Sequence, residues 1–284
     1  MKLIRFHNGN EVHIGAVEGD FIIDLTTSGL PFATMLELIA AGQQGLDAAH
    51  AALERRSQLV PFDRSLLLCP IEKPGKYLAI GMNYQKHLEE ADKLGVTRSK
   101  YQVWFNKQTT CLTGPFDEIV TGVTEKLDYE VELGLVIGKA AKMVSAGDAH
   151  NHVFGYFVAN DVSARDWQFH SPTFTMGKSF DTHGPIGPWI VTRDEIPDPH
   201  TLEIKCFVNG EQRQSSNTRH LIANLWEQIS YLSTAFTLEP GDLIATGTPE
   251  GVGVAMDPQV FLQPGDVVRC EVEGIGAIEN RVAA

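Results

Sequence analysis

Cysteine and long apolar runs are scarce in this sequence of 284 residues. The four cysteines, Cys69, Cys111, Cys206 and Cys270, are far apart and include no CxxC pair, which argues against a zinc knuckle and a disulfide framework. We therefore expect buried, reduced thiols. No run of about 18 uncharged apolar residues occurs, and the N-terminus lacks an apolar stretch long enough for a signal peptide. The sequence predicts a cytoplasmic protein.

Positive charge is also in short supply, because 23 lysines and arginines face 36 aspartates and glutamates, giving a formal net charge of -13. A field of this sign repels phosphate backbones and anionic membrane surfaces. The densest basic stretch, residues 86–107, is interleaved with Glu89, Glu90 and Asp92, so its local charge largely cancels. We expect neither nucleic acid nor a membrane as a partner.

Two domains are predicted. The strings MKLIRF, HIGAVEG and DFIIDL indicate short strands, and a helix is expected over residues 32–57. Three prolines and a glycine interrupt any periodicity over residues 60–76, which predicts a linker. We therefore place a small N-terminal α+β domain at residues 1–70 and a larger domain at residues 71–284.

The larger domain is dominated by short strands punctuated by glycine, with few long helices between them, which favours a mostly antiparallel, β-rich α+β fold. Helices are predicted only over residues 85–94 and 221–236, the second with an apolar stripe that begins at Leu221. The predicted strands are KYLAIG, YEVELGLVIG, VFGYFVAN, IGPWIVT, TLEIKCFVNG, DLIATG and VVRCEVEGIG.

The string DYEVELGLVIG, residues 128–138, carries the strongest chemical signal. Strict alternation places Glu130 and Glu132 on one face and Tyr129 and Val131 on the other. An isolated ExE pair is more often the solvated face of an antiparallel sheet. Here the strand is apolar on both faces beyond the pair, so we expect two buried carboxylates that converge on a cation.

Asp161 is a third candidate ligand, since it follows the apolar run VFGYFVAN, although aspartate at a strand end can equally be a turn or helix cap. With Glu130 and Glu132 it would offer only oxygen ligands, which suit Mg²⁺, Mn²⁺ or Ca²⁺. His150 and His152 could suggest zinc, but histidines in a polar connection are more often exposed, and we do not assign them.

Three further segments could contribute chemistry. In GMNYQKHLEEA, His87 and Glu90 share one helical face, where a carboxylate can orient an imidazole as a general base, although such pairs are also common by chance. Lys178 in GKS lies among small and apolar residues and could stabilise an anion. The glycine-dense loop TGTPEGVG, residues 246–253, could present hydroxyls and amides to an oxyanion or serve as a tight turn.

Taken in order, these motifs resemble those of the fumarylacetoacetate hydrolase superfamily over residues 71–280, and the N-terminal segment also resembles that of bacterial members. The resemblance implies a catalytic domain with a mixed β-sandwich roll, a homodimer, and a Mg²⁺ or Mn²⁺ site. The motifs are GMNYQKH, DYEVELGLVIG, GYFVANDVSARDWQ, GKSFDTHGPIGPW and LIATGTPEGVG.

The resemblance also implies residue roles. Lys178 would be the catalytic lysine, and His87 with Glu90 would activate a water molecule. The metal ligands would be Glu130, Glu132 and Asp161.

Substrate contacts are implied for Arg165 and Gln168, and Thr248 would bind the carboxylate end of the substrate. This chain departs from the acylpyruvate hydrolases at one position, because Met82 stands where they carry arginine in GRNY. The departure puts a second substrate carboxylate at that point in doubt.

The implied activity is hydrolysis of a 2,4-diketo acid, in which water activated by His87 attacks the far carbonyl and the carbon–carbon bond breaks to give pyruvate and a carboxylic acid. A lyase or isomerase on the same scaffold, such as an oxaloacetate decarboxylase or a hydroxymuconate-type isomerase, is the alternative. These reactions need no attacking water, so a His87→Ala variant would keep much of its activity. A non-catalytic small-molecule sensor is a remote third reading.

The acyl group is not identified. Residues 93–116 are expected to line the outer end of the pocket, and we predict that at least two of Tyr101, Trp104 and Phe105 pack in the core.

Overall fold

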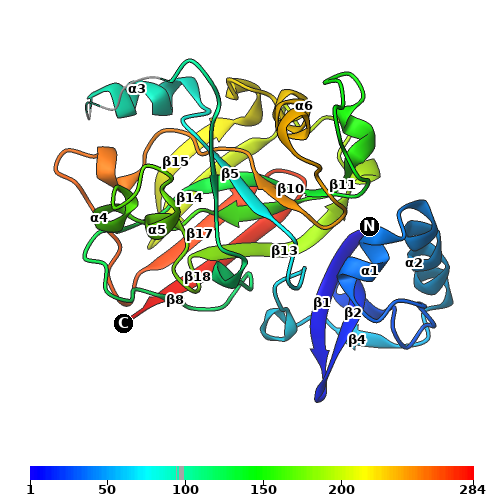
Figure 1. The fold of residues 1–284 in the computed structure, drawn as a ribbon. Coiled ribbons are helices and arrows are strands. Elements are labelled where there is room, and N and C mark those ends of the chain that lie inside the picture. The colour runs from blue at the N-terminus through cyan, green and yellow to red at the C-terminus, as the bar shows by residue number, and fades with distance from the viewer. Residues whose placement is uncertain (94, 96–98) are drawn as a thin grey trace.

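Two β-sheets packed face to face form the body of the protein in the computed structural model, which describes residues 1–93, 95 and 99–284 (Figure 1). Across these residues, the strands form an 11-stranded sheet, a five-stranded sheet and a two-stranded ribbon. Most neighbouring strands are antiparallel, and parallel pairs also occur. The prediction of a β-rich α+β fold with a mixed sandwich roll is confirmed.

The large sheet contains strands from both ends of the chain. Its strands are, in spatial order, β4 (Leu59–Pro61), β3 (Phe21–Asp24), β2 (Glu11–Glu18), β1 (Lys2–Asn8), β13 (Gly184–Thr192), β11 (Val153–Asn160), β10 (Val131–Ile137), β16 (Leu243–Ala245), β5 (Tyr77–Gly81) and β6 (Val103–Asn106), while β7 (Leu112–Thr113) pairs with β13.

The second sheet lies over β10 and β11. Its order is β15 (Glu211–Asn217), β14 (Glu203–Val208), β17 (Val267–Val272), β18 (Gly276–Ala283) and β8 (Ile119–Val120), and the ribbon pairs β9 (Leu127–Asp128) with β12 (Ser163–Ala164).

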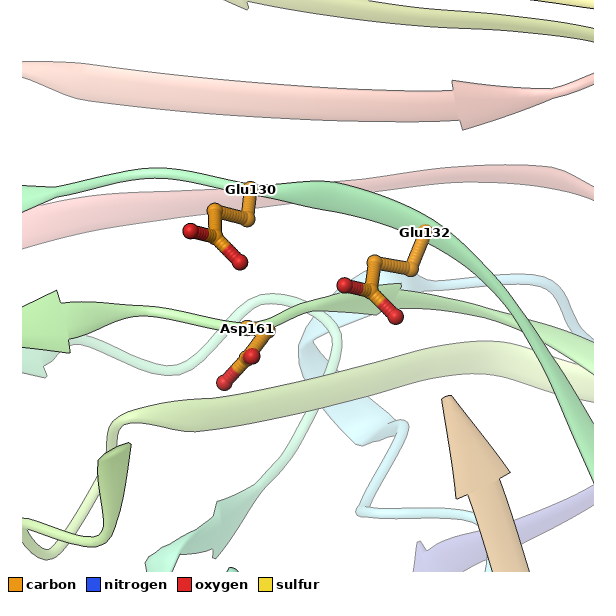
Figure 2. Close-up of side chains that lie close together, drawn as sticks. All are labelled: Glu130, Glu132 and Asp161. Carbon is orange, nitrogen blue, oxygen red and sulfur yellow. The ribbon is translucent and has the colours of Figure 1, made fainter. Parts of the chain in front are cut away.

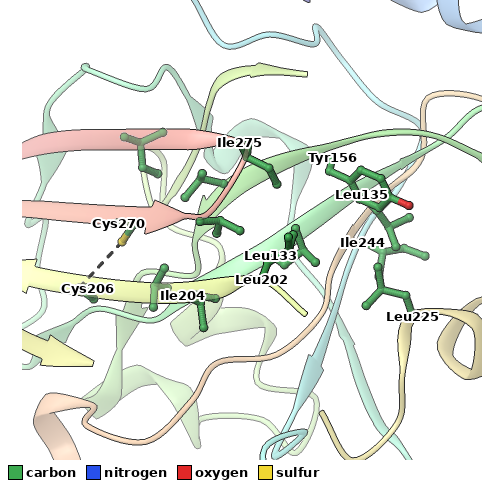
Figure 3. Close-up of a cluster of buried hydrophobic side chains, with 14 of the residues drawn as sticks. Leu133, Leu135, Tyr156, Leu202, Ile204, Cys206, Leu225, Ile244, Cys270 and Ile275 are labelled. Atoms are coloured by element: carbon green, nitrogen blue, oxygen red, sulfur yellow. Dashed lines mark hydrogen bonds between the residues drawn. The ribbon is translucent and has the colours of Figure 1, made fainter. Parts of the chain in front are cut away.

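The main core fills the space between the two sheets (Figure 3). Leu133 and Leu135 of β10 contribute to it, with Ile204 and Cys206 of β14 and Cys270 of β17. Every residue of β10 is buried, because one face meets this core and the other contributes Val136 to a second core cluster. The predicted alternation on this strand is confirmed, and so is the burial of most of the cysteine thiols.

The N-terminal strands continue the large sheet, since Leu3 of β1 pairs with Ile190 of β13. The helix predicted over residues 32–57 is wrong as a single element. It is two helices, α1 (Met35–Ala40) and α2 (Gln43–Arg55). Gly42 breaks it with a φ of 57°, a conformation that glycine adopts without strain.

The linker predicted over residues 60–76 is wrong in part, because its first residues are structured. Val60 of β4 pairs with Ile22, a short 3₁₀ turn covers Arg64–Leu66, and Leu67 forms a bridge with Phe6. We retain a boundary near residue 70 as a proposal.

The remaining α-helices follow β5 along the chain. Helix α3 (Gln85–Lys93) matches the prediction for residues 85–94 except at Leu94, which lies outside the described residues. Helix α6 (Leu225–Ala235) begins later than predicted, because Asn224 and Glu227 form a capping box that starts the helix after Leu221. The helices α4 (Arg165–Gln168) and α5 (Thr175–Lys178) follow β12. Within the described residues, no helix has the length and apolar character needed to cross a membrane.

Candidate active site

Three buried carboxylates converge beside β10. Glu130 and Glu132 project from the same stretch of chain toward Asp161, which follows β11 (Figure 2). One oxygen of each carboxylate lies within 4.8 Å of the others. Antiparallel pairing explains the convergence, because Val131 pairs with Asn160 and the Asp161 amide donates to the Glu130 carbonyl over 2.9 Å. The sequence-predicted ligand set is thus assembled in space.

Buried cations surround two of these carboxylates. Lys178 Nζ lies 2.7 Å from Glu130 Oε2 and 2.8 Å from Asp161 Oδ2. The other oxygens are also paired, since Arg165 Nη2 lies 2.7 Å from Glu130 Oε1 and Lys107 Nζ lies 2.5 Å from Asp161 Oδ1. Burial alone would raise the pKa of Glu130, but the charges of Lys178 and Arg165 outweigh it and lower that pKa to about 2.

Glu132 is different, because no ion pair with a lysine or arginine reaches it among the described residues. It accepts one backbone hydrogen bond, from Gly247 over 2.7 Å. Burial, followed by the charges of Asp161 and Glu130, raises its pKa well above the usual range. Among the described residues, therefore, no lysine or arginine is paired with the Glu132 carboxylate to neutralise its ionised form. A buried carboxylate without a cationic partner, beside two further carboxylates that offer only oxygen ligands, suits a hard divalent cation.

Glycine places the lysine in this cluster. Lys178 ends α5, and a Cβ at Gly177 would lie 2.4 Å from the Cα of Gln168 on α4. Only glycine allows α5 to approach α4 so closely. The glycine of GKS thus has a packing role here.

A cavity of about 270 Å³ opens above the carboxylates. Seven of the nine predicted site residues line it, while Glu132 and Asp161 lie buried in the cluster beneath. The seven are His87, Glu90, Glu130, Arg165, Gln168, Lys178 and Thr248.

The His87 and Glu90 pair forms part of the cavity wall from helix α3. His87 Nδ1 lies 3.2 Å from Glu90 Oε2, so the carboxylate can fix the imidazole tautomer and leave Nε2 available. The second oxygen of Glu90 accepts a hydrogen bond from the Gly251 amide over 3.0 Å. This contact joins α3 to the TGTPEGVG loop and positions the pair from two sides.

Arg165 and Gln168 are held together, with Arg165 Nη1 donating to Gln168 Oε1 over 3.0 Å. Asp128 was not assigned from the sequence, yet it fixes this pair. Its carboxylate accepts from Arg165 Nε over 2.8 Å and from the amides of Gly253 and Val254. Asp128 therefore ties the arginine to Gly253 and Val254, and Val254 also lines the cavity.

Lys107 was also missed by the sequence. Its ammonium is buried and donates to Asp161, to the Lys178 carbonyl and to the His183 carbonyl. Nothing local marks it, because it lies in a mixed-charge stretch far along the chain from its partners. Asp128 had a weak signal, since it opens the string that carries Glu130.

Other predicted features fall outside the charged cluster. Phe105 is buried and Trp104 packs against the main core, whereas Tyr101 is exposed, so the prediction of two core aromatics is confirmed. Of the described part of residues 93–116, Phe105 lines the cavity. Met82 lines it too, and presents an apolar side chain there.

The fold and site together define an enzyme with a mixed β-sandwich roll and an acidic site for a divalent cation beneath a small cavity. The family model for the fumarylacetoacetate hydrolase C-terminal region matches residues 76–283. The chain belongs to the fumarylacetoacetate hydrolase family.

Among similar proteins, mitochondrial oxaloacetate tautomerase FAHD2A of Bos taurus is 41% identical over 291 residues, covering 99% of this chain and 91% of that protein. The solved fumarylacetoacetate hydrolase of Exiguobacterium antarcticum is 38% identical, with a TM-score of 0.87 and coverage of 100% and 99%. The maleylpyruvate hydrolase of Sphingobium sp. SYK-6, solved with manganese (II) and pyruvate, is 33% identical, with a TM-score of 0.82 and coverage of 100% and 99%.

Proposed function

We propose that this protein is a divalent-metal-dependent tautomerase that interconverts the enol and keto forms of an oxaloacetate-like acid. The main support is that Glu130 of the carboxylate cluster and the His87 and Glu90 pair line the same cavity. Such a site can hold a 2-oxo acid and move a proton next to its ketone. The likeness to oxaloacetate tautomerases over 99% of the chain supports this choice.

The proposed reaction moves one proton from the enol oxygen to C3. A Mg²⁺ or Mn²⁺ ion held by Glu130, Glu132 and Asp161 would supply a Lewis acid for the oxygen atoms of the substrate. Lys178 adds a buried positive charge that stabilises the enolate oxygen after the enol proton leaves. His87, whose Nδ1 is paired with Glu90, takes up the enol proton at Nε2 and then delivers that proton to C3.

An oxaloacetate-like acid has two carboxylates, and the cavity offers separate positions for them. Thr248 would take the carboxylate beside the ketone. Lys126 also lines the cavity, is exposed, and forms no ion pair within the described part of the chain. We propose that Lys126 meets the far carboxylate, which compensates for the apolar Met82.

Hydrolysis of a 2,4-diketo acid to pyruvate and a carboxylic acid is the second candidate, since the same His87 and Glu90 pair could activate water. The likeness to maleylpyruvate hydrolase supports it at lower identity. In this proposal His87 carries the proton in the tautomerase and activates water in the hydrolase. Its loss therefore does not separate the two reactions, unlike the expectation from the sequence that an isomerase would keep activity without His87. Product identity does separate them.

The test is a stopped-flow measurement of enol-to-keto conversion with the Mn²⁺-loaded protein, combined with product analysis on a panel of acylpyruvates. We expect faster ketonisation of oxaloacetate than of a monocarboxylic enol, no release of pyruvate from acylpyruvates, and a loss of the dicarboxylate preference in Lys126→Gln. Pyruvate plus a carboxylic acid would instead establish the hydrolase, carbon dioxide the decarboxylase, and no turnover of any compound would favour a sensor.

Homodimer formation and a cytoplasmic location remain proposals. The bovine relative is described as mitochondrial, and that description applies to it alone.

A further inference from the structure

Gln214 lies outside the cavity but contacts a residue that lines it. It belongs to β15, in the second sheet, and is 1% exposed. Its Nε2 donates to Thr248 Oγ1 over 2.9 Å and to the Pro249 carbonyl over 2.8 Å. Its Oε1 accepts from the Val131 amide over 3.0 Å. The side-chain amide of Gln214, on β15, therefore contacts both β10 and the TGTPEGVG loop.

The orientation of this amide is fixed by its neighbours. The Val131 N–H can only donate, so the Gln214 oxygen must face it. The Pro249 carbonyl can only accept, so the Gln214 nitrogen must face that side. A flipped amide would break both contacts. Gln214 consequently acts as a hydrogen-bond donor toward Thr248.

A glycine brings the loop to this amide. Gly251 has a φ of 98°, and a Cβ there would lie 2.1 Å from the Arg213 carbonyl on β15. The loop therefore packs directly on the backbone of β15, one residue before Gln214. Tyr129 also donates to the Gly251 carbonyl over 3.1 Å. The contact between Gln214 and Thr248 is thus held from both sides.

We infer that Gln214 is a positioning residue that makes Thr248 a hydrogen-bond donor toward the ligand. A hydroxyl group has one proton, and accepting from Gln214 leaves the proton of Thr248 free to point into the cavity. The proposal rests on the proposed function, because it selects an acceptor such as the carboxylate of a 2-oxo acid at this point. A ligand group that can only donate would be disfavoured.

The experiment measures binding of oxalate to the Mn²⁺-loaded protein by calorimetry in a double-mutant cycle. Gln214→Met removes the amide donor at similar volume, and Thr248→Val removes the hydroxyl. We expect each to weaken oxalate binding about ten- to hundredfold, with the double variant no weaker than Thr248→Val alone. Thr248→Ser should retain binding. Gln212→Met, an exposed change on the same strand, is the matched control.

A merely structural role for Gln214 gives a different pattern. Its loss would then weaken oxalate binding in the Thr248→Val background as well, and would lower Mn²⁺ affinity measured without oxalate. Either result overturns the inference, as does the absence of oxalate binding to the wild-type protein. If Gln214→Met does not fold, equal oxalate binding by Thr248→Val and the wild-type protein would overturn it. Because the readout is binding, an absence of tautomerase turnover would count against the proposed function alone.

Discussion

Buried charge at single residues shapes both the site and the stability of this protein. His183 is a buried imidazole whose Nε2 donates to the Val120 carbonyl over 2.9 Å. Its Nδ1 is buried without a hydrogen-bond partner among the described residues. Burial, aided by the charge of Lys107, lowers the pKa of His183 to about 4. The folded protein therefore keeps this group neutral under mildly acidic conditions.

This predicts a loss of stability on mild acidification. An unfolded histidine gains its proton near pH 6.5, whereas folded His183 gains it only near pH 4, so the unfolded state binds more protons between these values. The contribution of neutral His183 to the unfolding free energy is fully present above about pH 6.5 and is lost as the pH falls toward 4. The largest loss from this group is about 3 kcal/mol.

The check is urea unfolding of wild type and His183→Gln at pH 7 and pH 5. His183→Gln should lose less unfolding free energy between the two pH values than the wild type. His7→Gln, a change at an exposed histidine, should behave like the wild type. An identical loss in all three proteins would contradict the prediction.

At the scale of elements, local patterns predicted strand β10 well and the bounds of the helices less well. The alternation from Tyr129 to Leu135 is a property of neighbouring residues, so the buried acidic pair could be found in the sequence. The prediction of a single helix over residues 32–57 failed because the composition of the segment was given more weight than Gly42. One glycine with a positive φ is enough to interrupt a helix. The start of α6 could have been predicted from Asn224 and Glu227, which form its capping box. The apolar stripe beginning at Leu221 led to the earlier predicted start.

Strand β10 also predicts a packing effect. A Cβ at Gly134 would lie 2.1 Å from the ring of buried Phe157 on the paired strand β11. Gly134→Ala should lower the unfolding free energy by about 1–3 kcal/mol through overpacking. Adding Phe157→Leu should recover part of the loss. Thermal or urea unfolding provides the measurement, with Gly147→Ala as control, since the nearest atom there is 3.8 Å away. Equal effects at Gly134 and Gly147 would show that the contact does not limit packing.

At the scale of the whole molecule, the site is built where distant segments meet. Lys107 follows β6, Glu130 precedes β10, Asp161 follows β11 and Lys178 ends α5. The residue types could be recognised from motifs, including the acidic trio and the GKS lysine. The pairing of these charges could not be predicted, because Lys107 contacts Asp161, which lies far along the chain. The same holds for the hydrogen bond between Gln214 and Thr248. The join between β1 and β13 likewise has no local signal.

The central claim is that one divalent cation on Glu130, Glu132 and Asp161 enables enol–keto conversion. The most direct measurement titrates Mn²⁺ into chelator-treated protein while following ketonisation of oxaloacetate. We predict that activity rises from background and saturates near one Mn²⁺ per chain, and that Glu132→Gln shifts the titration to higher Mn²⁺ by about tenfold or more. Full activity in the metal-free protein, or an unshifted titration in Glu132→Gln, would contradict the claim.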